Sequence, residues 1–171
     1  MSRSETEAVA ARGLIDPDLF RRACGRFATG IAVATVTGKD GQPYGLTINS
    51  FTSVSCCPPL ILICIDYRCS LLPHFRASSW FGINVLNDTQ QEVSLRFALR
   101  ESDRFTDLEW QSGSFGVPLV EGCLAQMECC VSQVIEAGDH AILIAEVIKA
   151  DWFEGEPLIY FGSEYRSLAR R

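Results

Sequence analysis

The side chains best suited to hold a ligand lie in residues 45–55. This segment carries five Ser or Thr hydroxyls and one Asn amide among apolar residues, and it has no charged residue. Hydroxyls and backbone N–H groups are neutral donors that can line an apolar, anion-accepting groove without the desolvation cost of Lys or Arg. The same composition is also typical of the polar face of an ordinary sheet edge, so the segment alone leaves both interpretations open.

Two other short stretches carry polar groups with possible roles. The turn Gly138-Asp139-His140 leads straight into an expected strand and places His140 at the rim of the expected barrel. An imidazole there can bind a polar ligand group or titrate near neutrality, although a rim histidine in a solvated turn is the plainer interpretation. The stretch Asp103-Arg104-Phe105, taken alone, indicates a surface salt bridge.

Hydrolytic and metal chemistry find little support in the sequence. There is no G-x-S-x-G, H-E-x-x-H or G-x-x-x-x-G-K-[ST] motif. A thiol nucleophile paired with His74 or His140 is possible on paper, but neither histidine has a recognisable orienting partner. No two of the eight cysteines have C-x-x-C spacing. Neighbouring cysteines on a strand point to opposite faces, so the doublets do not predict a metal site.

Length and charge exclude several classes of protein. The chain has 171 residues and a formal charge of −6, which suits one globular domain and argues against binding along a nucleic acid backbone. No apolar stretch approaches the roughly 20 residues of a membrane helix, and the first residues lack the apolar core of a secretory signal. We therefore expect a cytoplasmic protein whose cysteines are mostly reduced core thiols.

The elements that must position these residues can be read from caps and periodicity. Asp16-Pro17 predicts a helix start, followed by apolar positions at helical spacing up to Ala28. Short helices are expected over 70–77, capped by Ser70, and after Asp88, whereas 100–118 read as an irregular excursion. Strands are expected over 31–37, 44–54, 60–65, 80–86, 123–135, 140–152 and 157–161. The apolar run 60–65 suits a strand buried on both faces.

This pattern predicts a mostly β domain with two or three flanking helices. Six or seven mainly antiparallel strands joined by short turns favour a closed barrel with the helices packed outside. We expect a flexible lead-in over residues 1–15, one domain over 16–168 and a short tail over 169–171.

The order of several short motifs carries a stronger signal than any of them alone. They run Phe27-Ala-Thr-Gly30, Val33-Ala-Thr35, Gly45-Leu-Thr47, Asn49 to Ser55, Pro58-Pro59-Leu60, Phe81 to Leu86, Phe97-Ala98, Asp103-Arg104-Phe105, Gly138-Asp139-His140 and Tyr165-Arg166. In this order and spacing the chain resembles the flavin reductase-like family, the short-chain flavin reductases of two-component monooxygenases. The resemblance implies a Greek-key, FMN-binding split barrel.

The family pattern implies roles for individual residues. Thr47, Ile48 and Asn49 would border the flavin ring, and Ser53, Val54 and Ser55 would offer donors toward the ribityl phosphate. His140 would lie beside the nicotinamide or the flavin face and position the nicotinamide. The other residues implied as flavin-binding are Ser50, Phe97, Arg104 near the phosphate end, and Tyr165 and Arg166 where the C-terminal tail closes over the site.

The resemblance implies an NAD(P)H:flavin oxidoreductase that supplies reduced flavin to a partner monooxygenase. Its cofactors would be FMN or FAD with NADH or NADPH as hydride donor, and it would be a homodimer without nucleic acid or membrane partners. Hydride transfer between stacked rings needs no strong acid or base, which agrees with a chain that has only two His. Two alternatives remain: an enzyme with tightly held FMN that reduces another acceptor, and a non-catalytic flavin carrier or interaction module.

Overall fold

The structure is a computed structural model that describes residues 15–99 and 104–168. The expected lead-in up to residue 14 and the tail over 169–171 lie outside the described residues. Within the described ranges there are three helices, α2 (Pro17–Cys24), α3 (Leu72–Ala77) and α4 (Gln91–Ala98). None of them has the length and apolar character needed to span a bilayer.

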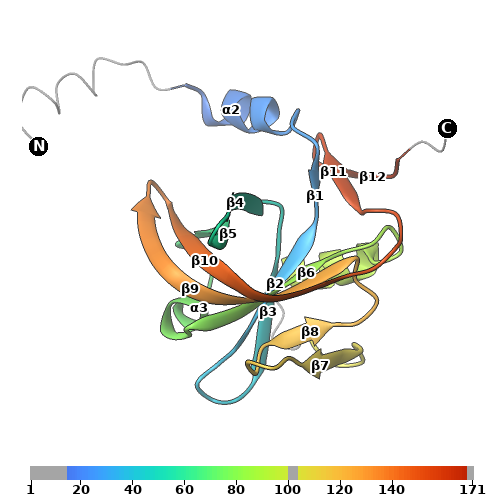
Figure 1. The fold of residues 1–171 in the computed structure, drawn as a ribbon. Helices are drawn as coiled ribbons and strands as arrows, with labels where there is room; N and C mark the ends of the chain where they lie inside the picture. The colour runs from blue at the N-terminus through green and yellow to red at the C-terminus, as the bar shows by residue number, and fades with distance from the viewer. Residues whose placement is uncertain (1–14, 100–103, 169–171) are drawn as a thin grey trace, which may run out of the picture.

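One seven-stranded sheet forms the body of the molecule. Its strands follow the order β3 (Pro43–Ile48), β2 (Ala32–Thr37), β6 (Trp80–Val85), β9 (Ala125–Ala137), β10 (His140–Trp152), β5 (Pro59–Asp66) and β4 (Thr52–Cys56). Every pairing is antiparallel. The sheet curls strongly, with the β9–β10 hairpin bending over one end (Figure 1). The prediction of a mostly β, antiparallel fold with flanking helices is confirmed.

The expected closed barrel is not what the strand pairings describe. Strands β3 and β4 are the two edges of the sheet and are not paired with each other among the described residues. They follow one another in the chain with only residues 49–51 between them. At this crossing the Ser50 hydroxyl, rather than a strand, accepts from Cys64 N at 3.0 Å and donates to Cys64 O at 3.1 Å. The Ser50 side chain thus binds the backbone groups of Cys64 at a point of β5 where a closing strand would otherwise pair.

Two small sheets flank the main one. One pairs β1 (Thr29–Gly30) with β11 (Ile159–Phe161) and β12 (Glu164–Arg166), and the other is the hairpin of β7 (Trp110–Ser112) and β8 (Pro118–Val120). The hairpin corrects the expectation of an irregular excursion over 100–118, of which 100–103 lie outside the described residues. Trp80 of the main sheet stacks on Phe115 in the hairpin turn at 3.9 Å between ring centroids.

The hydrophobic core lies inside the curled sheet, with a second cluster under α4. The main cluster is built from alternate residues of the strands and from Leu72 and Phe75 of α3. Strand β5 buries Ile61, Ile63 and Ile65, whereas the residues between them are half-buried. The expectation that this strand is buried on both faces was therefore wrong: one face carries the core, and the other is only partly covered.

Two polar side chains of β9, those of Gln126 and Glu128, are buried. Glu128 is 1% exposed and accepts from Ser114 N at 3.0 Å and Phe115 N at 2.8 Å. Its carboxylate lies 3.9 Å from Lys149 Nζ. A Cβ placed on Gly113 would come within 2.4 Å of this carboxylate. The β7–β8 turn therefore folds onto Glu128, and the carboxylate takes the place of water for its backbone N–H groups.

The helix starts agree with the sequence in one case of three. Asp16 caps α2 by accepting from Asp18 N at 3.1 Å, with Pro17 at the first helical position. The helix ends at Cys24, with Gly25 as its C-cap, and so before Ala28. Neither expected cap of the other helices is used, because α3 begins after Leu71 and α4 after Gln90. Helix α2 buries none of its residues and stands off the sheet (Figure 1).

The cysteines are less buried than expected. Only Cys123 and Cys129 are buried, and Cys24, Cys56 and Cys57 are exposed. Burial raises the pKa of the Cys123 and Cys129 thiols to about 12, so both stay protonated at neutral pH. The expectation that most cysteines are core thiols was therefore wrong for the doublet at 56–57, which lies at the turn between the edge strand β4 and its neighbour β5.

Replacing Glu128 by Gln should lower the free energy of unfolding by about 1–3 kcal/mol, because the amide nitrogen opposes a buried backbone N–H that then has no acceptor. Urea denaturation monitored by circular dichroism measures this value. The exposed residue Glu109 offers a matched control, and Glu109→Gln should stay within about 0.5 kcal/mol of the parent. Equal effects of the two substitutions would contradict the role given to the buried carboxylate.

Candidate functional site

A hollow of about 250 Å³ opens beside the crossing from β3 to β4. Residues 27–32 form one wall, and Asn49, Phe51 and Val85 form the rest. Six of these nine residues are apolar side chains, and Gly30 leaves one side free of side chain. Only Thr29 and Asn49 bring polar side chains to the hollow.

Neither polar side chain has a hydrogen-bond partner among the described residues. The Thr29 hydroxyl is shielded from solvent and has no partner among the described residues. Its backbone is fixed by pairing of β1 with β11, opposite Tyr160. The Asn49 side chain is exposed and likewise makes no hydrogen bond within the described ranges. Because a buried polar group without a partner is costly, the Thr29 hydroxyl fits a ligand that brings a polar edge into the hollow.

The donor set fits a planar heterocycle with an apolar part and a polar rim. Apolar walls favour burial of ring carbons, and two neutral side chains offer hydrogen bonds without a buried charge. The volume is below that of a pocket for a whole drug-sized ligand, about 300–1,000 Å³. The hollow therefore suits a ring, with the rest of the ligand lying outside it.

Thr47 and Tyr165 are brought together by a residue of α4 that sequence reasoning missed. Thr47 Oγ1 donates to Ser94 O at 2.6 Å, and the Ser94 hydroxyl shares a hydrogen bond with Tyr165 OH at 2.8 Å. Ser94 is fully buried. A serine in the middle of a helix gives no sign of this role in the sequence, because its partners lie 47 and 71 residues away.

The residues of the polar segment, 45–55, fall into two groups, those that hold the segment in place and those that face solvent. Ser50 is fixed by its two hydrogen bonds to Cys64, whereas Ser53 and Val54 are exposed on β4, at a bulge in its pairing with β5. The Ser55 hydroxyl accepts from Cys57 N at 3.2 Å. Ile48, by contrast, is buried in the core. Thus Asn49, Ser53 and Val54 face solvent, and Ile48 and Ser50 hold the segment in place.

Phe97 and Arg104 support the backbone rather than line the hollow. Phe97 is 1% exposed and meets Phe105 edge-on at 5.0 Å. A Cβ on Gly45 would lie 2.6 Å from the Phe97 ring, so only glycine allows this close packing. Arg104 Nη1 donates to Gly45 O at 2.5 Å, and Nη2 donates to Leu99 O. These contacts fix the start of the polar segment.

His140 lies at the end of β10 nearest the crossing. It pairs with Asp66 of β5, two residues along that strand from Cys64, which holds Ser50. Two residues of a strand span about 7 Å. His140 Nδ1 lies 2.6 Å from Asp139 Oδ1, and this hydrogen bond lowers the pKa of Asp139. The hydrogen bond to Arg68 lowers the pKa of Asp66, the residue that pairs with His140 across the two strands.

The structure therefore groups the predicted residues in part. Asn49, Ser50 and His140 lie at one end of β5, and Thr47 and Tyr165 meet at α4. Arg166 is turned to solvent and pairs with Glu164. Thr29 was named in the sequence only within a motif, and its orphaned hydroxyl is visible only in the structure.

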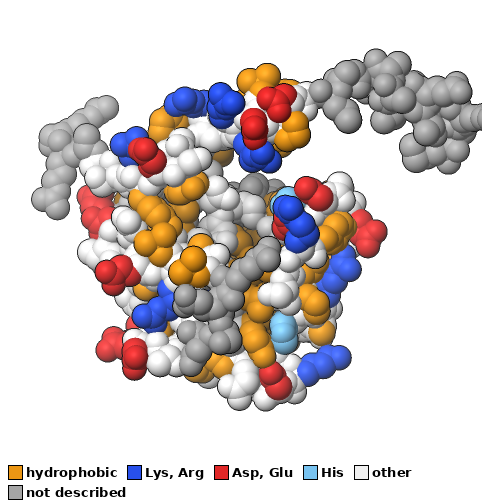
Figure 2. Space-filling view, turned by 180° about the vertical axis from the view of Figure 1, so that it is seen from behind, with side chains coloured by type: hydrophobic (Ala, Val, Ile, Leu, Met, Phe, Trp, Pro, Cys, Tyr) orange, Lys and Arg blue, Asp and Glu red, His pale blue; other side chains and the backbone are white. Residues whose placement is uncertain are grey.

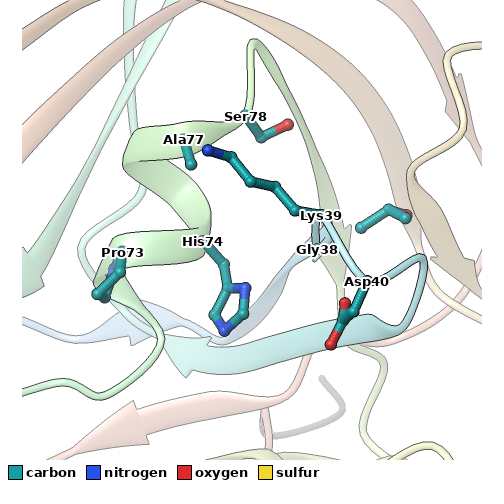
Figure 3. A pocket seen from close by; sticks show the side chains of 8 residues that line it. Gly38, Lys39, Asp40, Pro73, His74, Ala77 and Ser78 are labelled. Carbon is teal, nitrogen blue, oxygen red and sulfur yellow. The ribbon is translucent and has the colours of Figure 1, made fainter.

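A larger hollow, about 550 Å³, lies at the other end of β2. In Figure 3, Lys39 reaches from the β2–β3 loop toward Ala77 and Ser78, and His74 lies across the hollow. His74 stacks on Tyr44 at 3.9 Å. The 2.6 Å hydrogen bond from Tyr44 OH to Asp40 raises the pKa of the phenol and lowers that of the carboxyl. No motif residue of the polar segment lines this hollow.

A cysteine nucleophile gains no support from either histidine. Within the described ranges His74 and His140 make no hydrogen bond to a thiol, and His140 is occupied by Asp139. The site at the crossing thus offers binding and orientation rather than a nucleophile with its base.

Comparisons with known proteins agree with the motif order. A family model described as "Flavin reductase like domain" matches residues 24–169. The FMN reductase (NADH) SmoA of Agrobacterium fabrum is 40% identical over 152 residues, covering 89% of this chain and 86% of that protein. A flavin-dependent monooxygenase reductase subunit of Mycobacterium tuberculosis, HsaB, is 35% identical over 157 residues, covering 90% of this chain and 83% of that protein.

A solved structure agrees in fold over nearly the same range. The NADH:FAD oxidoreductase SgcE6 of Streptomyces globisporus, in complex with NAD and FAD fragments, superposes with a TM-score of 0.86 and 37% identity. The match covers 92% of this chain and 97% of that one. Some other matched proteins are longer, and this chain spans 43% of one relative and 53% of one solved chain.

Replacing Ser50 by Ala should lower the free energy of unfolding by about 1–2 kcal/mol, because it removes two hydrogen bonds to Cys64. Ser53→Ala, three residues along and exposed, should change it by less than about 0.5 kcal/mol. Urea titrations of both variants provide the comparison. If Ser53→Ala were the more destabilising of the two, the hydroxyl of Ser50 would not be what holds the crossing.

Proposed function

This chain belongs to the flavin reductase-like family, and from that premise we propose that it transfers hydride from NADH to FMN or FAD and releases the reduced flavin to a partner monooxygenase. The observation that carries the proposal is the hollow beside the β3–β4 crossing, with its apolar walls and two neutral side chains that have no hydrogen-bond partner in the described part of the chain. Relatives named as NADH-dependent flavin reductases and as monooxygenase reductase subunits support the donor and the partner.

The residues of this chain bind and orient rather than react. When bound, the flavin supplies the ring that accepts the hydride. Thr29 and Asn49 would hydrogen-bond the polar edge of that ring, and the apolar wall of residues 27–32 would exclude water from its face. No strong acid or base is needed for hydride transfer between stacked rings, which agrees with a site that lacks a catalytic dyad. Binding by neutral groups also lets the flavin leave.

The remaining site residues are assigned as proposals. We place Thr47 and Ile48 behind the ring, and Ser53, Val54 and Ser55 along the ribityl phosphate, since β4 presents them at the sheet edge. Phe97 and Arg104 act through the backbone of Gly45. We place Tyr165 and Arg166 at the closing C-terminal strand, and His140 beside the nicotinamide.

We further propose a homodimer in which a second copy covers the exposed apolar residues next to the hollow. Phe27 is 78% exposed and Trp152 is 74% exposed, and the amphipathic helix α2 buries nothing. Large contiguous apolar patches mark interaction surfaces, and we propose that these residues join into one such patch. We also propose that the curled sheet forms a split barrel, that residues 16–168 are one domain and that the protein is cytoplasmic.

A steady-state assay with NADH or NADPH and FMN or FAD, in all four combinations, tests the function. The absorbance at 340 nm should fall in at least the NADH reactions when free flavin is in excess. Absence of oxidation in every combination would reject the enzyme. A flavin that survives dialysis together with slow turnover of added flavin would instead indicate a tightly held cofactor.

Thr29→Val should raise the dissociation constant for oxidised FMN about tenfold, because the ring edge loses one hydrogen bond worth about 1 kcal/mol or more. Quenching of flavin fluorescence measures binding without turnover. Thr29→Ser keeps the hydroxyl and should bind within about threefold of the parent. If the valine and serine variants bound FMN alike, the hydroxyl would not contact the flavin.

His140→Ala should raise the KM for NADH more than the dissociation constant for FMN, because the imidazole is placed beside the nicotinamide. Initial rates at saturating FMN give the first quantity, and fluorescence titration gives the second. Asp139→Asn, which alters the group that orients the imidazole, should have the same but smaller effect. An equal loss of both affinities would contradict the placement.

A further inference from the structure

Three arginines gather at one place in a protein that is acidic as a whole. Arg21, Arg22 and Arg26 line a hollow of about 290 Å³ between the end of α2 and the β11–β12 turn, together with Asp18, Gly25, Gly162 and Ser163. The chain carries a formal charge of −6. In Figure 2, Lys and Arg side chains lie together with Asp and Glu side chains on the helix at the top of the molecule.

Only one of the three arginines has a carboxylate partner among the described residues. Arg21 pairs with Asp18. The Arg26 guanidinium lies over the Phe161 ring at 5.7 Å from its centroid, which orients the side chain without neutralising it. Arg22 makes no ion pair or hydrogen bond within the described ranges. Two positive charges in the hollow are therefore available to a ligand.

Helix stability explains only part of this cluster. Basic residues in the last turn of a helix interact favourably with its dipole, and this accounts for Arg21 and Arg22. Arg26 lies beyond the helix end at Gly25. It is held near the others because Gly162 N donates to Gly25 O at 2.8 Å, which joins the helix end to the β11–β12 turn. The turn is built from left-handed backbone at Gly162 and Ser163, with φ of 61° and 67°.

The chemistry of the hollow favours phosphate. Guanidinium groups present fixed pairs of N–H donors that match phosphate oxygens. The hollow is too small for a whole dinucleotide, since pockets for drug-sized ligands span about 300–1,000 Å³. It is large enough to hold a diphosphate group whose attached rings lie elsewhere.

The chain links this hollow directly to the site at the β3–β4 crossing. Arg26 lines the hollow beside the β11–β12 turn, and the next residue, Phe27, begins the wall of the hollow beside the β3–β4 crossing. One continuous stretch thus carries charge at one end and an apolar wall at the other. Arg104, which sequence reasoning placed near the phosphate, is engaged with the backbone oxygens of Gly45 and Leu99.

We propose that the hollow formed by Arg22, Arg26 and the β11–β12 turn binds the diphosphate of a dinucleotide whose ring occupies the neighbouring hollow. The inference rests on the proposed function for its substrate class. Two dinucleotides share this chemistry, the nicotinamide donor and FAD, and the corresponding mononucleotides lack the diphosphate.

The double variant Arg22→Gln/Arg26→Gln tests the proposal in the full-length protein. Its dissociation constant for inorganic pyrophosphate, measured by calorimetry, should rise at least about tenfold over that of the parent, because charge-assisted hydrogen bonds are lost. The variant Lys39→Gln/Arg76→Gln removes the same charge at the opposite hollow and at α3 and should bind pyrophosphate like the parent.

Comparison of dinucleotides with mononucleotides identifies the ligand. A rise in the KM for NADH but not for reduced nicotinamide mononucleotide assigns the site to the donor, and weaker binding of FAD but not FMN assigns it to the flavin. Unchanged values for both dinucleotides, or equal losses for the mononucleotides, would overturn the proposal. Pyrophosphate binding needs no turnover, so a parent protein that binds it without oxidising NADH would reject the proposed function alone.

Discussion

The hydroxyl of Ser50 is the contact on which the arrangement of the site depends. A curled antiparallel sheet must either close by pairing its edge strands or protect them in another way. Here the chain passes from one edge to the other in three residues, and a serine side chain satisfies both backbone groups of Cys64. The crossing is thereby held against β5 while Asn49 stays exposed. The hollow lined by residues 27–32, Asn49, Phe51 and Val85 lies beside this crossing.

A second constraint holds the opposite side of the sheet. Glu128, Asn84 and Gln126 are buried, and each accepts from or donates to backbone groups of the β7–β8 hairpin. Asn84 also donates to Val33 O of β2 at 3.1 Å. Buried polar groups of this kind specify one arrangement, because any other leaves them without partners. Strand β2 begins at the wall of the hollow, and the hydrogen bond from Asn84 holds its backbone in place.

Local signals predicted the elements well and the burial of their faces poorly. Asp16-Pro17 marked the start of α2, and the turn at Gly138 and the strand from His140 to Trp152 were found at their observed bounds. The closed barrel was wrong because the sequence does not show that a side chain replaces a strand at Cys64. The burial of Gln126 and Glu128 on β9 could not be predicted, because the hairpin that covers them comes from a separate stretch of chain. Motif order identified the family, but the unpaired hydroxyl of Thr29 follows from packing between β1 and β11, which no local pattern encodes.

Helix α2 has a consequence for behaviour on dilution. An isolated helix of eight residues is marginal in water, since nucleation is costly and few hydrogen bonds follow. The helix buries no residue against the rest of the chain. Its order within one copy rests on the Asp16 cap, the Asp18–Arg21 pair and the hydrogen bond from Gly162 N to Gly25 O. Its amide protons should therefore exchange rapidly in a lone chain and slowly once another surface covers its apolar side. Protein concentration would then set the fraction of molecules in which α2 is ordered. The affinity for a phosphate-bearing ligand would therefore rise with protein concentration.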